Sequence, residues 1–330
     1  MSGSSKINCV VLLGPTAVGK TSLGVRLADS FGWEIISADS RQVYKGLDIG
    51  SGKDLKEYTV TKTDADGNSV QKQIPYHLID VADLKDEYNV FNYQSDFYGI
   101  FRKLESEKKT AFVVGGTGMY LDSVIRGYDF VPVEENTELR KELASKSLEE
   151  LAQMLLELKP DLHNKSDLLI RERVVRAIEI ELFMKSPECE KLRKTLPVRP
   201  QINSLVLGTT IDRDELHKNT KKRLLERIDE GMIEEVENLH KNGVSWERLY
   251  KLGLEYRFVS EYLQGKAGTK EEMILHLNHA INQFAKRQET WFRGMEKKGV
   301  TIHWLPKVPD KQLRFDAACK ILLENGIKLP

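Results

Sequence analysis

The sequence predicts an α/β protein with a parallel sheet and an inserted all-helical lobe. A buried apolar strand runs directly into a glycine loop and a helix over residues 9–31, and further apolar strands end in polar or glycine residues. Between them, residues 123–197 carry apolar side chains at helical spacing. We therefore expect a first core part at 1–122, a helical insertion at 123–197, and a part at 198–330 that completes the core and adds basic helices.

The N-terminal segment contains a P-loop. After the strand "CVVLL" at 9–13, the stretch "GPTAVGKT" at 14–21 fits the pattern G-x-x-x-x-G-K-[ST]. Leu23, Leu27 and Phe31 then recur at helical spacing. Amides at the start of such a helix face phosphate oxygens, a lysine adds charge, and a threonine hydroxyl can hold Mg²⁺. The pattern predicts a P-loop NTPase-like core, whose diphosphate-binding residues are Gly14, Thr16, Ala17, Val18, Gly19, Lys20 and Thr21, with Thr21 as the metal ligand.

The P-loop alone does not identify the phosphate that it binds. The pattern is typical of nucleotide-binding and ATP-binding proteins. However, the strand and catalytic carboxylates of a standard ATPase are not recognisable: "AFVVGG" ends in glycine, and "NSLVLGTTID" reaches its aspartate only after two threonines. ATP and another diphosphate therefore both remain open as ligands.

Composition excludes several classes of protein. Lys plus Arg and Asp plus Glu number 50 each, so a protein that coats nucleic acid non-specifically is disfavoured, whereas a local basic RNA-binding surface is permitted. The sequence has no run of 18 apolar residues, so we expect no membrane association. Cys9, Cys189 and Cys319 are far apart and lack C-x-x-C spacing, so we expect reduced thiols in a cytoplasmic protein.

A second predicted strand, residues 34–38, brings an acidic residue close to the P-loop. Ligands of open parallel sheets bind at the carboxyl ends of the strands, so Asp39 is expected beside the phosphate site. Its carboxylate could accept a proton there from a nucleophile. The alternative is that Asp39 only caps the N-terminus of a helix, and the spacing favours neither interpretation.

Two further segments are predicted from local pattern. A third strand at 111–114 precedes Gly115 and Gly116, where the backbone can approach a ligand closely. The stretch "EYTVTKTDADGNSVQKQI" predicts a β-hairpin near 58–75 with Asp66-Gly67 in its turn. We assign no function to this hairpin.

Six blocks together resemble one enzyme family. In chain order they are "GPTAVGKT", "SADSRQVYKGLDIGSGK", "YHLID", "VVGGTGMY", "RVVRAIEI" and "AKRQETWFR". They are similar to the tRNA dimethylallyltransferases, a family that includes the adenylate isopentenyltransferases, and the similarity extends from about Val10 to about Trp304. The resemblance implies attack by an adenine exocyclic amine, at the adenosine 3′ of the anticodon, on dimethylallyl diphosphate. The P-loop would then hold the leaving diphosphate with Mg²⁺.

The resemblance also implies roles for individual residues. Three residues would be catalytic: Asp39 as the general base, Thr117 in contact with the reacting centre, and Lys20, which would also bind the diphosphate. For Thr117, the alternative is a residue that only caps the helix opening at Gly118. The helical insertion would close over the RNA. The residues expected to contact tRNA are Asp39, Ser40, Arg41, Gln42, Thr117, Arg140, Glu172, Arg173, Arg176, Lys286 and Arg287.

The basic segment near the C-terminus allows two interpretations. Basic residues between 286 and 298 alternate with Phe284, Trp291 and Phe292, which suits RNA backbone binding and base stacking. An amphipathic helix with its aromatic side chains in the core explains the aromatic residues equally well.

Three positions depart from the family pattern on the RNA side. Glu172 stands where a glutamine is usual, Leu254 lies in a block that usually reads GY-[KR]-E, and Asn282 replaces a frequent arginine. A carboxylate facing RNA phosphates is unfavourable, so contacts at Glu172 are in question.

The expected partners are tRNA and dimethylallyl diphosphate, the expected cofactor is Mg²⁺, and the expected state is a monomer. An adenylate isopentenyltransferase acting on free AMP, ADP or ATP is the nearest alternative. A P-loop small-molecule kinase would use Asp39 to activate a hydroxyl. An RNA-binding protein with a decayed active site is the non-catalytic alternative.

Overall fold

The computed structural model describes residues 6–63, 67–160 and 168–330. The chain divides into two compact units, one made of residues 1–128 and 200–330 and the other of residues 129–199.

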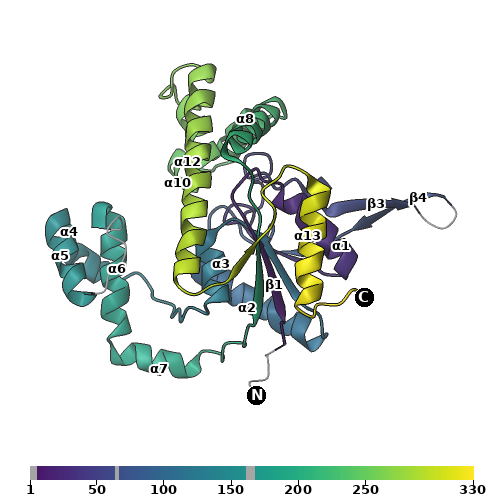
Figure 1. Ribbon diagram of the computed structural model, residues 1–330. Coiled ribbons are helices and arrows are strands. Elements are labelled where there is room, and N and C mark those ends of the chain that lie inside the picture. The colour runs from purple at the N-terminus through teal and green to yellow at the C-terminus, as the bar shows by residue number, and fades with distance from the viewer. Residues whose placement is uncertain (1–5, 64–66, 161–167) are drawn as a thin grey trace. The chain divides into compact units, whose positions relative to one another are not determined.

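A six-stranded sheet forms the centre of the first unit (Figure 1). The strands lie in the order β5-β2-β6-β1-β7-β8, and every neighbouring pair is parallel. Their bounds are β1 (Cys9–Leu13), β2 (Ile35–Ala38), β5 (Tyr76–His77), β6 (Ala111–Gly115), β7 (Ser204–Gly208) and β8 (Ile302–Trp304). The strand predicted at 9–13 is confirmed, and those predicted at 34–38 and 111–114 differ by one residue at one end. All strands of a parallel sheet end at the same edge, and that edge carries the P-loop.

Helices cover both faces of this sheet. Every residue of β1 is buried, because its side chains point alternately into two cores. Val10 and Leu12 pack in the core shared with α1 (Lys20–Phe31) and α13 (Lys311–Glu324). Val11 and Leu13 pack in the opposite core. Its helices are α2 (Val90–Ser106), α3 (Gly118–Ile125) and the C-terminal part of α12 (Lys270–Lys297). The result is a three-layered α/β core.

A helical subdomain continues from the sheet. It contains α8 (Arg213–Asp229), α9 (Met232–Lys241), α10 (Trp246–Leu252) and α11 (Leu254–Leu263), which share a third core with α12 and the loop after β2. Gly231, with a φ of 102°, separates α8 from α9 and is the N-cap of α9.

The second unit is all-helical within its described residues. Its helices are α4 (Thr137–Ala144), α5 (Leu148–Leu158), α6 (Arg171–Met184) and α7 (Pro187–Thr195). Five buried residues form its core: Leu143, Leu151, Leu155, Val174 and Ile178. The prediction of continuous helix from residue 123 is wrong at the start, because α3 ends at Ile125 and residues 126–136 are irregular.

The expected hairpin is present. It consists of β3 (Thr59–Thr63) and β4 (Ser69–Gln73), paired antiparallel after the short 3-10 helix η1 (Leu55–Tyr58). Lys62 and Lys72 tie it to α1 through ion pairs with Asp29, at 2.7 and 3.0 Å. Of the turn predicted at Asp66-Gly67, Gly67 has a φ of 84°, and Asp66 lies outside the described residues.

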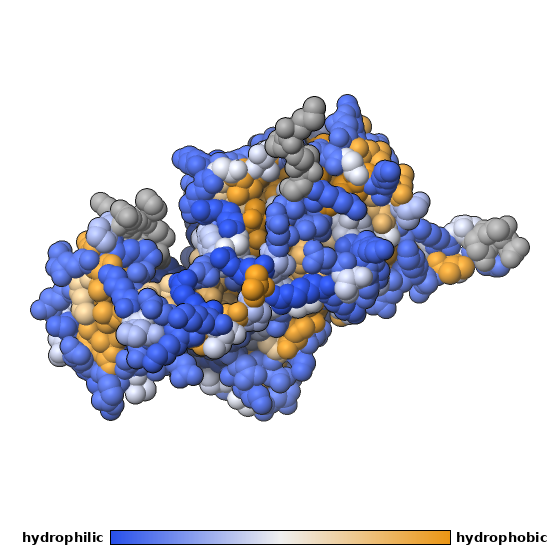
Figure 2. All heavy atoms as spheres, turned by 90° about the horizontal axis from the view of Figure 1, so that it is seen from below, coloured by the Kyte–Doolittle hydropathy of each residue, from blue (hydrophilic) through white to orange (hydrophobic). Residues whose placement is uncertain are grey.

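Hydrophilic residues cover most of the face drawn in Figure 2, where apolar residues form separate small patches. Across the described parts of the chain, each helix is either too short or too polar to cross a bilayer.

Candidate active site

The P-loop joins β1 to α1, and two of its residues have a left-handed backbone conformation. Gly19 is the N-cap of α1 with φ 79°, and Ala17 has φ 60° although it carries a Cβ. A Cβ added at Gly14 would lie 2.3 Å from the Thr209 carbonyl oxygen, so only glycine fits where the loop passes the end of β7. Holding Ala17 in the left-handed region requires support from the surrounding structure.

That support comes from side chains that capture the loop from four directions. Lys20 Nζ donates to the carbonyl oxygen of Pro15 at 2.5 Å, and Asn219 Nδ2 on α8 donates to that of Ala17 at 3.4 Å. Arg314 Nη1 on α13 donates to that of Val18 at 2.6 Å, and Gln288 Oε1 on α12 accepts from the Thr16 amide at 2.8 Å. With these carbonyl oxygens engaged, the amides at the start of α1 remain available to an anion.

We expect Arg314→Met to lower the free energy of unfolding by about 1–3 kcal/mol. Arg314 is 4% exposed, and its removal leaves the Val18 carbonyl oxygen buried without a donor. Urea titration followed by circular dichroism measures the change. Lys320→Met on the same helix is the control, because Lys320 is exposed and forms a weak surface pair with Glu324 at 3.9 Å. Equal stability losses in the two variants would contradict the role assigned to Arg314.

A cavity opens between the P-loop and the ends of β2 and β6. Its polar lining comes from segments far apart in the sequence, among them the P-loop, the turn after β2, the loop at 51–52, and the helices α8, α11 and α12. The lining residues include Thr16, Lys20, Thr21, Ser37, Asp39, Arg41, Gln42, Ser51, Gly52, Tyr58, Gly115, Gly116, Arg223, Arg227, Glu255, Phe284 and Gln288. A second cavity shares Lys20, Thr21, Arg223 and Arg227 with the first.

Four cationic side chains surround this cavity against two carboxylates. The pKa of Lys20 is lowered to about 7, mainly by burial and to a smaller extent by repulsion from Arg223, although Asp39 opposes the shift. Burial and Arg223 also lower the pKa of Arg227 to about 10. Within the described residues, Arg227 Nη2 is buried without a hydrogen-bond partner. An anion in the cavity would offset the repulsion among these cations and could accept a hydrogen bond from Arg227 Nη2. The cavity therefore suits a diphosphate.

Diphosphate binding should therefore be accompanied by proton uptake on Lys20. Above pH 7 the free ammonium loses its proton, since its pKa is about 7. A bound anion favours the charged form and raises that pKa. Affinity then falls as pH rises above 7, by up to about tenfold per pH unit, until the pKa of the complex is passed. Calorimetry with inorganic diphosphate at pH 8, in two buffers of different ionisation enthalpy, measures the uptake.

The Lys20→Met variant is the reference for this measurement, because it leaves the titration of diphosphate itself unchanged. An uptake equal to that of the wild type would place the titrating group elsewhere.

Asp39 stands at the end of β2 and folds back on its own turn. Its Oδ1 accepts from the amides of Arg41 and Gln42, at 3.0 and 3.4 Å. The residues that follow form turns rather than a helix, so the interpretation of Asp39 as a helix N-cap is wrong. Among the described residues, Oδ2 makes no hydrogen bond, and the carboxylate lines the cavity. One oxygen therefore fixes the side chain while the other can accept a proton.

Thr117 reaches back to the same turn. It occupies the N-cap position of α3, but its side chain forms no capping hydrogen bond. Instead, Thr117 Oγ1 accepts from the Ser40 amide at 3.0 Å and lies 3.4 Å from Ser40 Oγ. The alternative that Thr117 only caps the helix is therefore wrong. Its hydroxyl joins the ends of β2 and β6 beside Asp39.

Arg41 and Gln42 face inward from this turn. Arg41 forms an ion pair with Glu255 on α11, which is 5% exposed, and lies 5.4 Å from the centre of the Phe284 ring. Burial alone would lower the pKa of Arg41, but Glu255 and Asp39 raise it overall. Gln42 Nε2 donates to the Gly52 carbonyl oxygen at 3.0 Å.

The basic segment of α12 divides between surface and core. Lys286 and Arg287 are exposed and do not line the cavity, and Arg287 lies 5.9 Å from the Phe284 ring centre. Phe292 is fully buried, which excludes it from base stacking, whereas Trp291 is 37% exposed. The departure Asn282 accepts from Thr220 on α8 at 2.8 Å, so it joins two helices.

The other predicted RNA-facing residues belong to the second unit. Arg140 pairs with both oxygens of the buried Glu179, at 2.7 and 2.8 Å, and this pairing raises the pKa of Arg140. Arg176 also contacts Glu179, at 3.1 Å, and donates to the Val133 carbonyl oxygen at 2.6 Å. Glu172 and Arg173 are exposed at the start of α6.

Several cavity residues were not expected from the sequence. Arg223 and Arg227 lie one turn apart on α8, and Gln288 on α12 connects Thr16 to the Gly116 carbonyl oxygen at 2.8 Å. The i, i+4 arginine spacing is a usable signal, but charged residues on a helix are usually solvated. Glu255, the partner of Arg41, is another unexpected cavity residue.

Known proteins resemble the whole chain. A family model described as IPP transferase matches residues 42–295, and one described as isopentenyl transferase matches residues 7–64. A "tRNA dimethylallyltransferase 2" of Treponema denticola is 51% identical over 308 residues, covering 93% of this chain and 98% of the relative. A protein of the same name from Shewanella sediminis is 47% identical over 319 residues, covering 97% and 99%.

Solved structures agree in fold. The tRNA isopentenylpyrophosphate transferase of Bacillus halodurans superposes with a TM-score of 0.66 at 28% identity, over 97% of each chain. A eukaryotic dimethylallyltransferase captured acting on tRNA has a TM-score of 0.71 at 21% identity, over 96% of this chain and 78% of its own, and shows the fold alone.

Proposed function

Because this chain belongs to the IPP transferase family, the family of the tRNA dimethylallyltransferases, we propose that it carries out their reaction. It transfers a dimethylallyl group from dimethylallyl diphosphate to the exocyclic amine of the adenosine on the 3′ side of the anticodon. The protein is thus a transferase that modifies tRNA. One observation carries the chemistry: a cationic cradle for a diphosphate and the carboxylate of Asp39 line the same cavity.

The proposed step forms one bond and breaks another. The amine nitrogen attacks the first carbon of the dimethylallyl group, and the bond from that carbon to the diphosphate oxygen breaks. The diphosphate leaves with the electron pair, and the amine loses a proton to Asp39. Negative charge grows on the leaving oxygens, where the P-loop amides, Lys20, Arg223 and Arg227 already point their positive charge.

Mg²⁺ is the proposed cofactor. The residues present fit it in the manner of a P-loop: Thr21 would supply one hydroxyl at the cavity, and phosphate oxygens and water would supply the other ligands. The described residues contain no cluster of three or more side chains able to hold the ion without phosphate. When bound, Mg²⁺ offsets charge on the diphosphate.

We assign the P-loop to the donor diphosphate rather than to ATP. In this assignment the P-loop binds the leaving diphosphate. Asp39 then accepts a proton from the amine of an adenine, whereas in a kinase it would accept one from the hydroxyl of the substrate. Family membership supports the assignment, as does the absence of a recognisable standard ATPase strand in the sequence.

The acceptor side is proposed to include Ser40, Arg41, Gln42 and Thr117, which lie beside the proton-accepting carboxylate of Asp39. Lys286 and Arg287 are exposed on α12 and suit tRNA phosphates. From the second unit we propose Arg140, Glu172, Arg173 and Arg176 as further tRNA contacts. Since the first unit of one chain supplies the described lining of the cavity, we propose that a monomer is active. We also propose that the protein acts in the cytoplasm, because its proposed substrate is tRNA.

A transfer assay with radiolabelled dimethylallyl diphosphate and Mg²⁺ tests this function. Unmodified tRNA with adenosine 3′ of the anticodon, AMP and ATP serve as parallel acceptors. We expect label in tRNA only, and its loss when Mg²⁺ is chelated. Label in free nucleotide would assign the chain to adenylate prenylation, and no label with any acceptor would refute the transferase.

A further inference from the structure

We propose that Lys53 is a positioning residue for Asp39, acting through Asp80 and the backbone of Gln42. The inference rests on the proposed function, in which Asp39 accepts the proton of the amine. Lys53 does not line the cavity and touches no reacting group, so its effect reaches the site through the protein.

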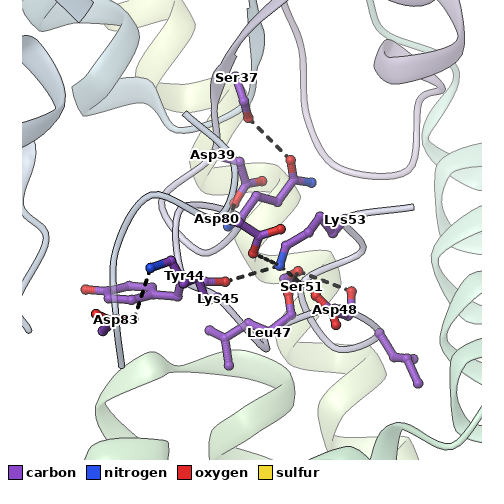
Figure 3. Close-up of polar contacts among 12 residues, drawn as sticks. Ser37, Asp39, Tyr44, Lys45, Leu47, Asp48, Ser51, Lys53, Asp80 and Asp83 are labelled. Atoms are coloured by element: carbon purple, nitrogen blue, oxygen red, sulfur yellow. Dashed lines mark hydrogen bonds and ion pairs between the residues drawn. The ribbon is translucent and has the colours of Figure 1, made fainter. Parts of the chain in front are cut away.

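Lys53 is a buried ammonium group with all three of its protons used. The residue is 2% exposed, although it follows a glycine-containing loop. Its Nζ donates to Asp80 Oδ1 at 2.5 Å, to Asp48 Oδ1 at 2.6 Å and to the Tyr44 carbonyl oxygen at 3.1 Å (Figure 3). An ammonium has three donors, so the group is saturated. It ties together three separate points of the chain.

The first path runs from Lys53 to the carboxylate of Asp39. Asp80 has a φ of 56°, a conformation that a non-glycine residue keeps only when the surrounding structure stabilises it. The hydrogen bond from Lys53 to the Asp80 side chain provides such stabilisation. The Asp80 amide donates to the Gln42 carbonyl oxygen at 3.0 Å. The amides of Gln42 and Arg41 in turn donate to Asp39 Oδ1. Movement of Asp80 therefore shifts the turn that orients the base.

The second path runs through the loop that ends at Lys53. The Lys53 amide donates to the Asp48 carbonyl oxygen at 3.1 Å, which closes the loop. Inside it, the Gly52 carbonyl oxygen accepts from Gln42 Nε2 at 3.0 Å and from Arg223 Nη2 at 3.5 Å. Lys53 thus fixes the position of the Gly52 carbonyl oxygen. This oxygen holds Gln42 in the turn at 39–42 and Arg223 at the diphosphate site.

The same segment offers a matched lysine. Lys45 pairs with Asp83 at 3.3 Å, and both side chains are more than half exposed (Figure 3). The two pairs join the same two stretches of chain, but Asp83 makes no hydrogen bond to the turn at 39–42 within the described residues. A surface pair of this kind contributes little. Lys45→Met therefore controls for losing a lysine–aspartate bridge between these stretches.

The experiment compares Lys53→Met with Lys45→Met in tRNA transfer. Because a displacement of about 1 Å at a reacting group reduces rates by roughly 100-fold, we expect kcat to fall between about 10- and 100-fold in Lys53→Met and to stay unchanged in Lys45→Met. Affinity for inorganic diphosphate should fall by less than about threefold, since most of its partners lie on other segments. Asp80→Asn, at a side chain 37% exposed, supplies a second variant with the same expected split if Lys53→Met folds poorly.

A double-mutant cycle separates positioning from mere stability. Once Asp39 is replaced by Asn, Lys53→Met should reduce kcat little further, because the base it orients is gone. Full multiplication of the two losses, with diphosphate affinity falling in parallel, would overturn the proposal.

Hydrogen exchange gives a readout that does not depend on activity. In Lys53→Met, the amides of Arg41 and Gln42 should exchange faster by at least about tenfold, whereas Lys45→Met should leave them unchanged. Unchanged protection of this turn would overturn the inference, whatever the assay shows. A wild type without transfer to tRNA, together with faster exchange in Lys53→Met, would instead reject the proposed function and keep the structural link.

Discussion

Asp39→Asn is expected to lower kcat for transfer to tRNA by about 10²–10⁴-fold, the range of a lost general base. Asparagine keeps an oxygen in the place of Oδ1, so the amides of Arg41 and Gln42 retain their acceptor and the turn persists. What disappears is the basic oxygen that faces the cavity. Single-turnover measurement of label transfer, with enzyme in excess over tRNA, gives the chemical rate directly.

Affinity for diphosphate provides the internal check on this variant. Asp39 adds negative charge to the cavity and so repels an anionic ligand, and its neutralisation should leave diphosphate binding equal or tighter. Asp83→Asn, an exposed aspartate that contacts Lys45, is the matched control and should keep full activity. A drop of less than tenfold in Asp39→Asn would mean that another group, or solvent, takes the proton.

Lys20→Met is expected to reduce kcat by about 10²–10³-fold, as for removal of a group aimed at developing charge. In the structure the ammonium is held by the Pro15 carbonyl oxygen and flanked by Arg223, so it is poised at the start of α1 beside the diphosphate cradle. Methionine matches the lysine side chain as far as Cε and lacks only the charged Nζ with its donors. Steady-state assays at saturating donor and tRNA measure the loss.

Lys62→Met is the companion variant for Lys20. Lys62 contacts the same helix through Asp29, but at the exposed hairpin, and its loss should leave kcat unchanged. A Lys20→Met enzyme that recovered full kcat at high donor concentration would show that Lys20 contributes uniform binding and no stabilisation of the leaving group.

Much of the fold follows from local sequence pattern. The strand at 9–13 and its glycine loop are predicted correctly because five apolar residues, a P-loop pattern and a helical repeat lie side by side. The hairpin is signalled by alternation around a turn. In contrast, β5 and β8 have two and three residues, too few for any periodicity to register. Their place is set by pairing with β2 and β7, which no local pattern encodes.

The candidate site shows the same division. Lys20 and Asp39 are indicated by motif and by the rule that ligands lie at the strand ends, and the structure places both on one cavity. Arg227 and Gln288 reach that cavity from helices more than 180 residues away, and on their own helices they resemble ordinary surface residues. The role of Lys53 could not be predicted from the sequence for a related reason, because Asp48 and Asp80 come close to it only in the folded chain.

The capture of the P-loop by distant helices has a consequence for biosynthesis. The loop is synthesised well before the helices that hold it, because its contact with Gln288 spans 272 residues and that with Arg314 spans 296. Strand β1 must likewise wait for β6 and β7 to flank it. A growing or prematurely ended chain therefore carries the phosphate motif without the clamps that shape it. Competence to hold the donor arrives only after α13 has been made and has packed against the loop, so catalysis cannot begin while this helix is missing.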